Sequence, residues 1–284
     1  MNHRSSHRSV QPLSLVLRFL VWAAATATLA ILVFLIGYVL IKGLPHITPS
    51  LFSLTYNSQN VSLLPSVITT VEMTFFSLLI AVPLGVFTAI YLVEYARRGS
   101  RAVELIRLTA ETLSGIPSII YGLFGMLFFV STMGFGLSVL SGAFTLSIMI
   151  LPLIIRTTEE ALASVPDLYR EASFGLGAGR LRTVFRVVLP SAIPGILGGV
   201  ILGIGRIVGE TAALLYTAGT VPQIPETVLS SGRTLALHMY LLSSEGLYTN
   251  EAYATAVVLL CIVLVINTLS AMVAKGLFMG RRNK

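Results

Sequence analysis

Residues Glu171–Pro190 read EASFGLGAGRLRTVFRVVLP, a polar stretch in a chain that is otherwise mostly apolar. The stretch begins with Glu171 and Ala172, is interrupted by Gly177 and Gly179, and continues with three arginines before the next apolar run. We interpret it as a helix-forming segment that lies outside the membrane, between two membrane spans. A polar segment in this position is expected to contact a partner outside the membrane.

The composition of the chain excludes an ordinary soluble domain. Of its 284 residues, 55% are hydrophobic and 11% are charged, whereas soluble domains carry roughly 25% charged residues. The net charge is +7, but the basic residues form short clusters between apolar runs, without the aromatic platform of a nucleic-acid binder. The single cysteine, Cys261, excludes an intrachain disulfide. The sequence therefore predicts an all-α, polytopic membrane protein whose partner is the lipid bilayer and not nucleic acid.

Six apolar segments are predicted as membrane spans. About twenty residues cross a bilayer, and several of the segments reach this length. The first resembles a signal peptide, but its apolar core is too long and no small-residue cleavage site follows it, so we expect an uncleaved span. The six predicted transmembrane helices are Leu17–Ile41, Ser66–Val93, Leu108–Ser131, Ala143–Ile155, Pro190–Tyr216 and Glu251–Leu277.

The distribution of basic residues predicts the orientation of these spans. Of the 19 lysines and arginines, sixteen fall on one side of the predicted membrane, two (Lys42 and Arg233) fall on the other, and Arg206 lies within a span. Cytoplasmic loops carry the excess of Lys and Arg. Both termini and the 171–190 segment are therefore expected to be cytoplasmic.

Two charged residues, Arg206 and Glu210, lie in the motif GIGRIVGETAALL of the fifth predicted span. A charge inside a membrane costs ~2.5 kcal/mol or more, which makes a functional role the first hypothesis. Their spacing of four residues places both on one face of a continuous helix. Arginine suits phosphate-like oxyanions because its planar guanidinium binds them in a bidentate manner. The alternative is a structural ion pair in which each residue neutralises the other.

Three other charged residues admit two interpretations each. Arg156 ends the fourth predicted span in LPLIIRTTEEAL and is either part of a substrate path or a cytoplasmic anchor. Glu72 and Glu111 lie near the starts of the second and third predicted spans. Each is either a residue that reaches the membrane surface or a partner for Arg206.

The glycine-rich motifs predict close helix packing more readily than ligand binding. Gly199 with Gly203 and Gly205 with Gly209 are small-xxx-small pairs, which let helices approach closely. The glycines of GIPSIIYGLFG also predict tight packing. The GLGAG of residues 175–179 lacks the Lys-Ser/Thr ending of a nucleotide-binding loop. No such loop occurs in the sequence, and the histidines (His3, His7, His46 and His238) have no metal-ligand spacing. We therefore expect no catalytic residue, no metal and no cofactor in this chain, and any ATP hydrolysis must belong to another chain.

The 171–190 segment resembles the EAA loop of ABC importer permeases. That signature contains Glu-Ala-Ala, a glycine four residues after its last alanine, and an aliphatic-x-Leu-Pro ending. The residues at the matching positions are Glu171, Ala172, Ser173, Gly177, Val187, Leu189 and Pro190, with departures only at Ser173 and Val187. The resemblance implies that this loop contains a short helix that docks into the ATPase, with Gly177 ending the helix.

Further motifs extend the resemblance over nearly the whole chain from Ser66 onward. SGIPSIIYGLFG, LPLIIRTTEEAL, GRIVGETAALL and LHMYLLSSEG resemble the PstA-type permeases of phosphate-specific ABC importers. The resemblance implies a type I importer (MetI-like) permease fold in a bacterial inner membrane. It implies a sister permease (PstC), two ATPase subunits (PstB) that bind ATP and Mg, and a periplasmic phosphate-binding protein (PstS). By motif match, it assigns Arg156, Arg206 and Glu210 to phosphate passage.

The sequence predicts three regions: residues 1–65 with the first span and its following loop, a transport domain at 66–277 with the coupling loop at 171–190, and a tail at 278–284. Alternatives to phosphate import are the same architecture for sulfate, molybdate or phosphonate, or the sister permease of the phosphate system. An ion-coupled secondary transporter would not need the EAA-like loop and usually shows an internal repeat. A membrane scaffold would not need Arg206 and Glu210.

Overall fold

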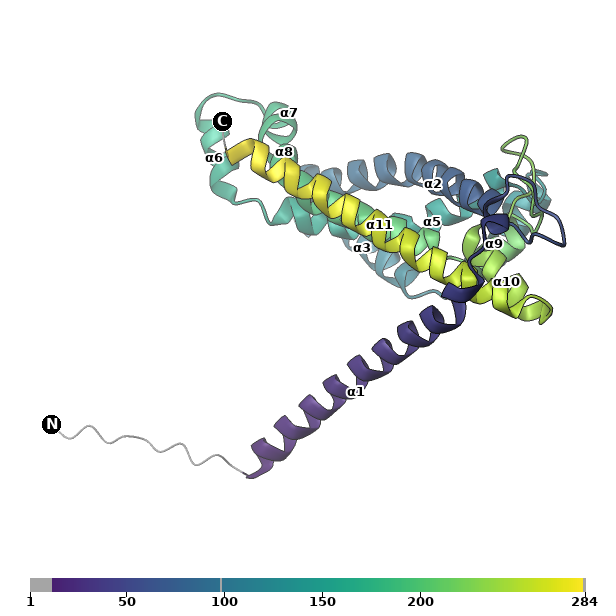
Figure 1. The fold of residues 1–284 in the computed structure, drawn as a ribbon. Helices are drawn as coiled ribbons and strands as arrows, with labels where there is room; N and C mark the ends of the chain where they lie inside the picture. Colours follow the sequence, from purple (N-terminus) through teal and green to yellow (C-terminus); the bar gives the residue numbers. More distant parts are fainter. Residues whose placement is uncertain (1–11, 98, 283–284) are drawn as a thin grey trace.

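The apolar runs form helices, because a chain inside a bilayer must satisfy its backbone hydrogen bonds internally. The computed structural model describes residues 12–97 and 99–282. Five stretches of continuous helix are long and apolar enough to cross a membrane: Ser14–His46, Leu64–Tyr95, Val139–Ala163, Arg180–Val208 and Thr249–Leu269. Their principal helices are α1 (Pro12–Gly43), α2 (Leu64–Ile90), α5 (Val139–Ala163), α8 (Leu189–Val208) and α11 (Thr249–Arg282) (Figure 1).

The third predicted span is bent. In place of one helix over Leu108–Ser131, the chain forms α3 (Arg101–Ser114) and α4 (Ser118–Gly125), which continues as the π-helical turn η4 (Met126–Thr132). The two parts are bent by 102°. The cause is the Gly115-Ile116-Pro117 sequence between them, because the residue before a proline disfavours helical backbone angles. The prediction of six spans holds when this bent pair is taken as one span.

The fourth and fifth spans also differ from their predicted bounds. α5 runs about two turns beyond Ile155, so that Arg156 lies inside the helix and not at its end. α8 ends at Val208, and a short helix, α9 (Ala212–Thr217), follows after a break. The prediction of a continuous helix over Pro190–Tyr216 was therefore wrong, because Gly209 caps α8 and the chain leaves the helix there.

Close packing at small residues joins the central helices. α5 packs against α2 on one side and α8 on another. A methyl group on Gly195 would approach Ala161 to 2.7 Å, and one on Gly199 would overlap Thr157. Likewise a methyl group on Gly122 of α4 would come within 2.8 Å of the Cα atom of Ala213. The predicted packing role is confirmed for Gly199 and for the GIPSIIYGLFG motif. Gly205, by contrast, faces open space.

The first helix stands apart from this bundle. In Figure 1, α1 diverges from the other helices and meets them at the end where it contacts α11. Its apolar side chains are exposed, Phe19 and Trp22 among them. An apolar helix with so little contact within its own chain is suited to lipid or to another subunit.

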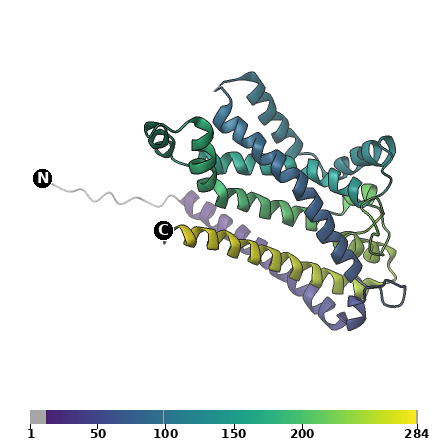
Figure 2. The ribbon, with the colours of Figure 1, turned by 90° about the horizontal axis from the view of Figure 1, so that it is seen from above.

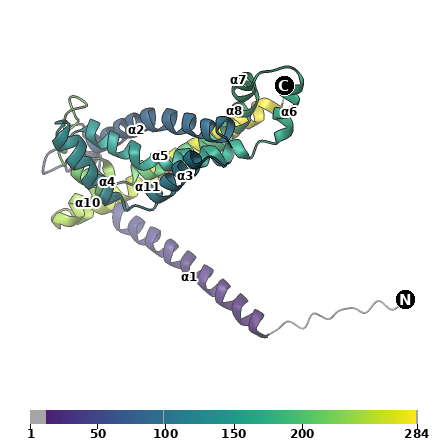
Figure 3. The same cartoon turned by 180° about the vertical axis from the view of Figure 1, so that it is seen from behind.

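The two ends of the bundle are built differently. One end carries α6 (Asp167–Gly175), α7 (Arg180–Thr183) and the π-helical turn η5 (Val184–Val188), together with the last turns of α11 (Figures 1 and 2). At the other end lie α9, α10 (Leu235–Glu245) and the loops that contain the turns η1 (Leu44–His46) and η2 (Pro49–Phe52), as Figure 3 also shows. We refer to these as the α6 end and the loop end. The predicted tail at 278–284 continues α11 as far as Arg282. The terminal residues Arg4, Arg8, His3, His7 and Lys284, used in the sequence arguments, lie outside the described residues.

Candidate functional site

The segment that resembles an EAA loop forms a helical elbow at the α6 end. α6 contains Glu171 and Ala172 and ends at Gly175, and Gly177 follows with φ at +80°. Such a backbone angle strongly favours glycine, so Gly177 turns the chain after the helix as expected. Val187 lies in η5, and Leu189 with Pro190 begins α8. The structure therefore places all the motif residues in one compact elbow.

The outer surface of this elbow is apolar and exposed. Leu176, at the tip, is 90% exposed. Other exposed apolar side chains surround it on the same elbow: Leu168, Tyr169, Phe174 and Leu181. A cluster of this kind outside the predicted spans indicates a surface that binds another protein.

Two contacts hold the elbow in place, and the sequence analysis found neither. Arg170 of α6 forms an ion pair of 2.7 Å with Glu94, which lies in the π-helical turn η3 (Tyr91–Tyr95) at the end of α2. The Oγ of Ser173 lies 2.8 Å from Oγ1 of Thr183 on α7. Because Glu94 and Arg170 are 76 residues apart, nothing in the local sequence pattern could pair them.

Arg206 and Glu210 do not share a helical face, which corrects the prediction. α8 ends between them, at Val208, and Glu210 is 92% buried while Arg206 is exposed. Oε1 of Glu210 accepts a hydrogen bond of 3.0 Å from the backbone N–H of Ala213, in the first turn of α9. In this position a carboxylate satisfies a helix-terminal donor and complements the helix dipole. Glu210 thus shapes the break after α8.

Arg206 has no carboxylate partner in the described part of the chain. The ion pairs found there involve other residues, and neither Glu72 nor Glu111 pairs with it. The phenol group of Tyr121 on α4 lies close enough to Arg206 for an electrostatic interaction. An exposed guanidinium without a carboxylate partner on a membrane helix remains available to an anion or to another subunit.

Arg156 lies in a second charged region, nearer the α6 end. Its Nε forms an ion pair of 3.2 Å with Glu160, one turn along α5, and both side chains are 67% exposed. A pocket of 180 Å³ beside it is lined by Arg107, Glu111, Arg156 and Glu159 among others. Arg107 and Glu159 join α3 to α5 by an ion pair of 3.1 Å. Glu111 therefore lies in the same pocket as Arg156 and is not a partner of Arg206.

The two arginines lie at different depths of the bundle. Thr157 of α5 faces Gly199 of the antiparallel helix α8, which sets the register of the two helices. In this register Arg156 is level with residue 200, six residues before Arg206. At a rise of 1.5 Å per residue, the two positions are separated by about 9 Å along the helix axes. The chain thus carries two exposed arginines in succession along the axis of the bundle.

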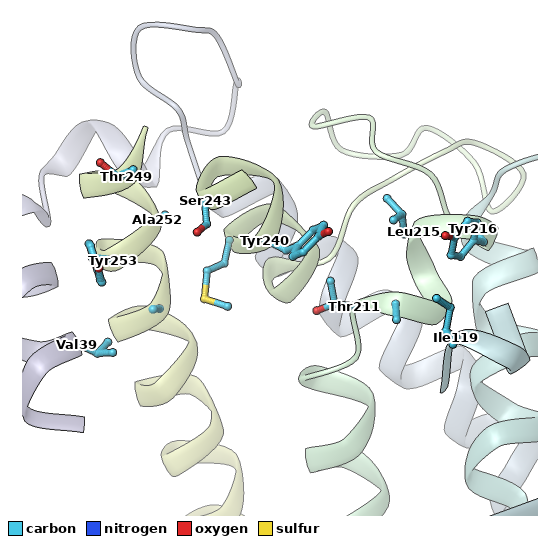
Figure 4. A pocket seen from close by; sticks show the side chains of 13 residues that line it. Val39, Ile119, Thr211, Leu215, Tyr216, Tyr240, Ser243, Thr249, Ala252 and Tyr253 are labelled. Atoms are coloured by element: carbon cyan, nitrogen blue, oxygen red, sulfur yellow. The ribbon is translucent and has the colours of Figure 1, made fainter. Parts of the chain in front are cut away.

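A larger pocket of 620 Å³ lies at the loop end, between α1, α9, α10 and α11. Figure 4 shows Thr211, Tyr216 and Tyr240 on one side of it and Val39 with Tyr253 on the other. None of its lining residues is charged. This pocket therefore lacks the cations that an oxyanion site needs, and an apolar group fits it better.

A polar cluster at the loop end contains the buried residues His238 and Arg233 and the half-buried Tyr56. The Arg233 guanidinium lies over the ring of Tyr56 at 4.8 Å, and the ring centroids of Tyr56 and His238 are 6.1 Å apart. His238 is on α10, which is not among the helices that could cross a membrane. Burial, together with the nearby positive charge of Arg233, lowers the pKa of His238 from 6.5 to about 3, and the backbone of Val61 offsets this slightly. His238 is therefore neutral at physiological pH.

This low pKa predicts that acid destabilises the fold. Between about pH 6.5 and 3 the unfolded chain binds a proton at His238 and the folded chain does not. The free energy of unfolding therefore decreases as the pH is lowered, by about 2 kcal/mol at pH 5. We expect the midpoint of thermal unfolding, measured in detergent, to decrease from pH 7 to pH 5. The decrease should be smaller in His238→Gln, which cannot take up the proton. An equal decrease in the variant would contradict this assignment.

The fold and these sites together define a multi-pass membrane transport subunit, with charged residues among its spans and an elbow with exposed apolar side chains at one end. The chain matches the family of binding-protein-dependent transport system inner membrane components over residues 81–279. It belongs to this family of ABC importer permeases, which work with an ATPase and a substrate-binding protein.

Individual relatives agree with this membership. The chain is 37% identical over 258 residues to the probable ABC transporter permease protein YqgI of Bacillus subtilis, covering 84% of this chain and 87% of that protein. It is also 37% identical over 197 residues to the phosphate transport system permease protein PstA 1 of Mycobacterium tuberculosis, covering 68% of this chain and 64% of that protein. Its fold resembles the MetNI methionine ABC transporter in an inward-facing conformation, with a TM-score of 0.60, 21% identity, and 75% of this chain and 93% of that chain covered. The predicted type I importer, MetI-like fold is confirmed.

Proposed function

We propose that this chain is a PstA-type permease that forms half of the path of an ATP-driven phosphate importer. The observation that carries the proposal is Arg206, an exposed guanidinium on a membrane helix without a carboxylate partner among the described residues. A cation in a low-dielectric path stabilises a dehydrated oxyanion, and guanidinium groups bind phosphate oxygens in a bidentate manner. The likeness to phosphate permeases supports the same substrate.

Arg156 and Arg206 serve as successive positions for the anion in this proposal. Their separation of about 9 Å along the bundle axis lets the anion move from one to the other. Glu160 pairs with Arg156 and keeps that position from holding the anion too tightly. Glu210 contributes indirectly: its carboxylate caps α9 and so stabilises the break in the helix that follows Arg206. The exposure of both arginines supports a path completed by a sister permease (PstC).

The elbow formed by α6 and α7 couples the permease to ATP hydrolysis in this proposal. Its exposed apolar cluster around Leu176 provides the surface for an ATPase subunit. Two ATPase subunits (PstB) hold ATP and Mg, one beneath each permease, and a periplasmic phosphate-binding protein (PstS) delivers the substrate at the loop end. Closure of the ATPase pair moves the elbow and rocks the attached helices as rigid bodies.

The α6 end is cytoplasmic in this proposal, and so are both termini. Arginines crowd that end of the described chain, including Arg97, Arg101, Arg170 and Arg182, whereas the loop end carries Lys42 and Arg233. This distribution supports the orientation, since basic residues are retained on the cytoplasmic side.

The test is ATP hydrolysis and transport by the complete complex in proteoliposomes. We expect phosphate with its binding protein to stimulate hydrolysis and to enter the vesicles, and sulfate to do neither. Stimulation by sulfate, molybdate or phosphonate instead would show that the chain is an importer permease for that anion and not for phosphate. Phosphate uptake without ATP or without a separate ATPase subunit would overturn the importer function.

A further inference from the structure

The side chain of Arg170 joins three structural elements at the α6 end. Its Nε and Nη2 donate to Oε1 of Glu94 at 3.1 and 2.7 Å. Its Nη1 donates to the carbonyl of Val165 at 2.7 Å, and Nη2 also donates to the carbonyl of Leu162 at 3.0 Å. A further bond of 3.2 Å runs from Nη1 to Asp167. With these contacts all five N–H groups of the guanidinium have an acceptor.

Apart from Asp167, which lies in α6 itself, these acceptors belong to the ends of two membrane-crossing helices. Glu94 lies in the last turn of the span that contains α2. Leu162 lies in the last turn of α5, where its carbonyl also accepts from the backbone N–H of Val165 at 3.3 Å, and Val165 lies just beyond the helix. Arg170 itself lies in α6, whose side chains are otherwise not buried. One side chain therefore fastens the elbow helix to the ends of α2 and α5.

The burial of this pair distinguishes it from the other ion pairs described. The side chains of Arg170 and Glu94 are 14% and 8% exposed, whereas Arg156 and Glu160 are both 67% exposed. Exposed pairs contribute little, but loss of one partner from a buried pair leaves an uncompensated charge. The connection through Arg170 is therefore rigid compared with the other ion pairs.

The other side of α6 is connected more loosely. The chain from Leu176 to Gly179 contains two glycines with open space around them, and Gly177 has a positive φ. Across this turn α6 is linked to α7 by the contact between Ser173 and Thr183, and the Arg180 guanidinium lies over Tyr95 at 5.2 Å. Glycines give this turn a freedom that the Arg170 side lacks.

We propose that Arg170 is the positioning residue that transmits the movement of α6 to α2 and α5. The transmitting contact to α2 is its ion pair with Glu94. This inference rests on the proposed function, because it presumes that an ATPase moves the elbow. α6 and the ends of α2 and α5 move as one body. α8 moves with α5, because Gly195 and Gly199 of α8 pack closely against it. Without the Arg170 contacts, ATP-driven movement of α6 changes only the conformation of the segments on either side of it and does not reach α2 and α5.

The experiment compares Glu94→Gln and Arg170→Gln in the complete complex with the two permeases, the ATPase and the binding protein. Glu94→Gln keeps a hydrogen-bond acceptor of the same shape and removes the charge. For both variants we expect unchanged co-purification of the ATPase and ATP hydrolysis within about 2-fold of the wild type. The number of oxyanions transported per ATP should fall by about 10-fold or more, as loss of a buried charged contact at a moving junction implies. Arg101→Gln, which replaces an exposed arginine at the start of α3, is the control and should leave this ratio unchanged.

Three results would overturn the proposal. An unchanged ratio in Glu94→Gln would show that the contact does not transmit movement, even if Arg170→Gln failed to assemble. Loss of ATPase co-purification in both variants would make the pair a support for docking instead. A fall of the ratio in Arg101→Gln as well would show a general effect of charge. If the wild-type complex imports sulfate instead of phosphate, the substrate assignment fails while the ratio, measured with sulfate, still tests the role of Arg170.

Discussion

Replacing Arg206 with alanine is expected to abolish phosphate uptake while leaving the complex assembled. The guanidinium is exposed on α8 and has no carboxylate partner in the described chain, so its removal leaves no buried carboxylate unpaired. Removal of a charge that pairs with a desolvated partner costs about 2–5 kcal/mol. Since each 1.4 kcal/mol is a factor of ten, uptake should fall by about 30-fold or more. Uptake of labelled phosphate into proteoliposomes measures this directly.

Two variants sharpen this result. Arg206→Lys keeps the charge but loses the bidentate geometry, and it should retain an intermediate rate. Glu210→Gln keeps an acceptor for the N–H of Ala213 and should reduce uptake less than Arg206→Ala does. If Arg206→Ala transported phosphate at the wild-type rate, Arg206 would lie outside the path, and a structural role would be the better explanation.

The second large effect is expected at the elbow. Gly177 has a φ of +80°, and a β-branched residue there is strained by about 1–3 kcal/mol. Gly177→Val should therefore change the direction of the turn after α6 and displace Leu176, which is 90% exposed at its tip. We expect the ATPase to be lost on co-purification. Glu171→Ala and Leu176→Glu should weaken the association without changing the turn.

The chain offers a matched control for this substitution. Gly246 also has a positive φ, +72°, and open space around it, but it lies after α10 at the loop end. Gly246→Val introduces the same local strain far from the elbow and should leave ATPase co-purification unchanged. Equal ATPase retention in Gly177→Val and Gly246→Val would remove the docking hypothesis.

The local sequence was enough to predict much of the architecture. The apolar runs gave helices in the right order because a membrane span is determined by length and hydrophobicity. Gly177 was correctly expected to end the short helix, because the glycine and the pattern around it are local signals. The bend after α3 also has a local signal, Gly115-Ile116-Pro117, although the predicted span ran through it.

Other features depend on contacts between distant residues. The length of α5 beyond Ile155 follows from its packing against α8, where Ala161 and Thr157 face glycines. The end of α8 at Val208 separates Arg206 from Glu210, and the capping contact with Ala213 stabilises that break. A continuous periodic pattern cannot reveal such a break, because hydrophobicity remains high across it.

The sequence by itself determined that this is a multi-span membrane protein, with a segment that resembles an EAA loop and with charged residues among its spans. It did so because hydrophobicity, turn residues and motif spacing are local properties. Only the tertiary structure decided which charges remain unpaired and which are neutralised. Arg206 is left exposed, Arg156 pairs with Glu160, and Arg170 is buried against Glu94. The energy of a charge depends on its burial and on the distance to its partner, and the folded chain sets both.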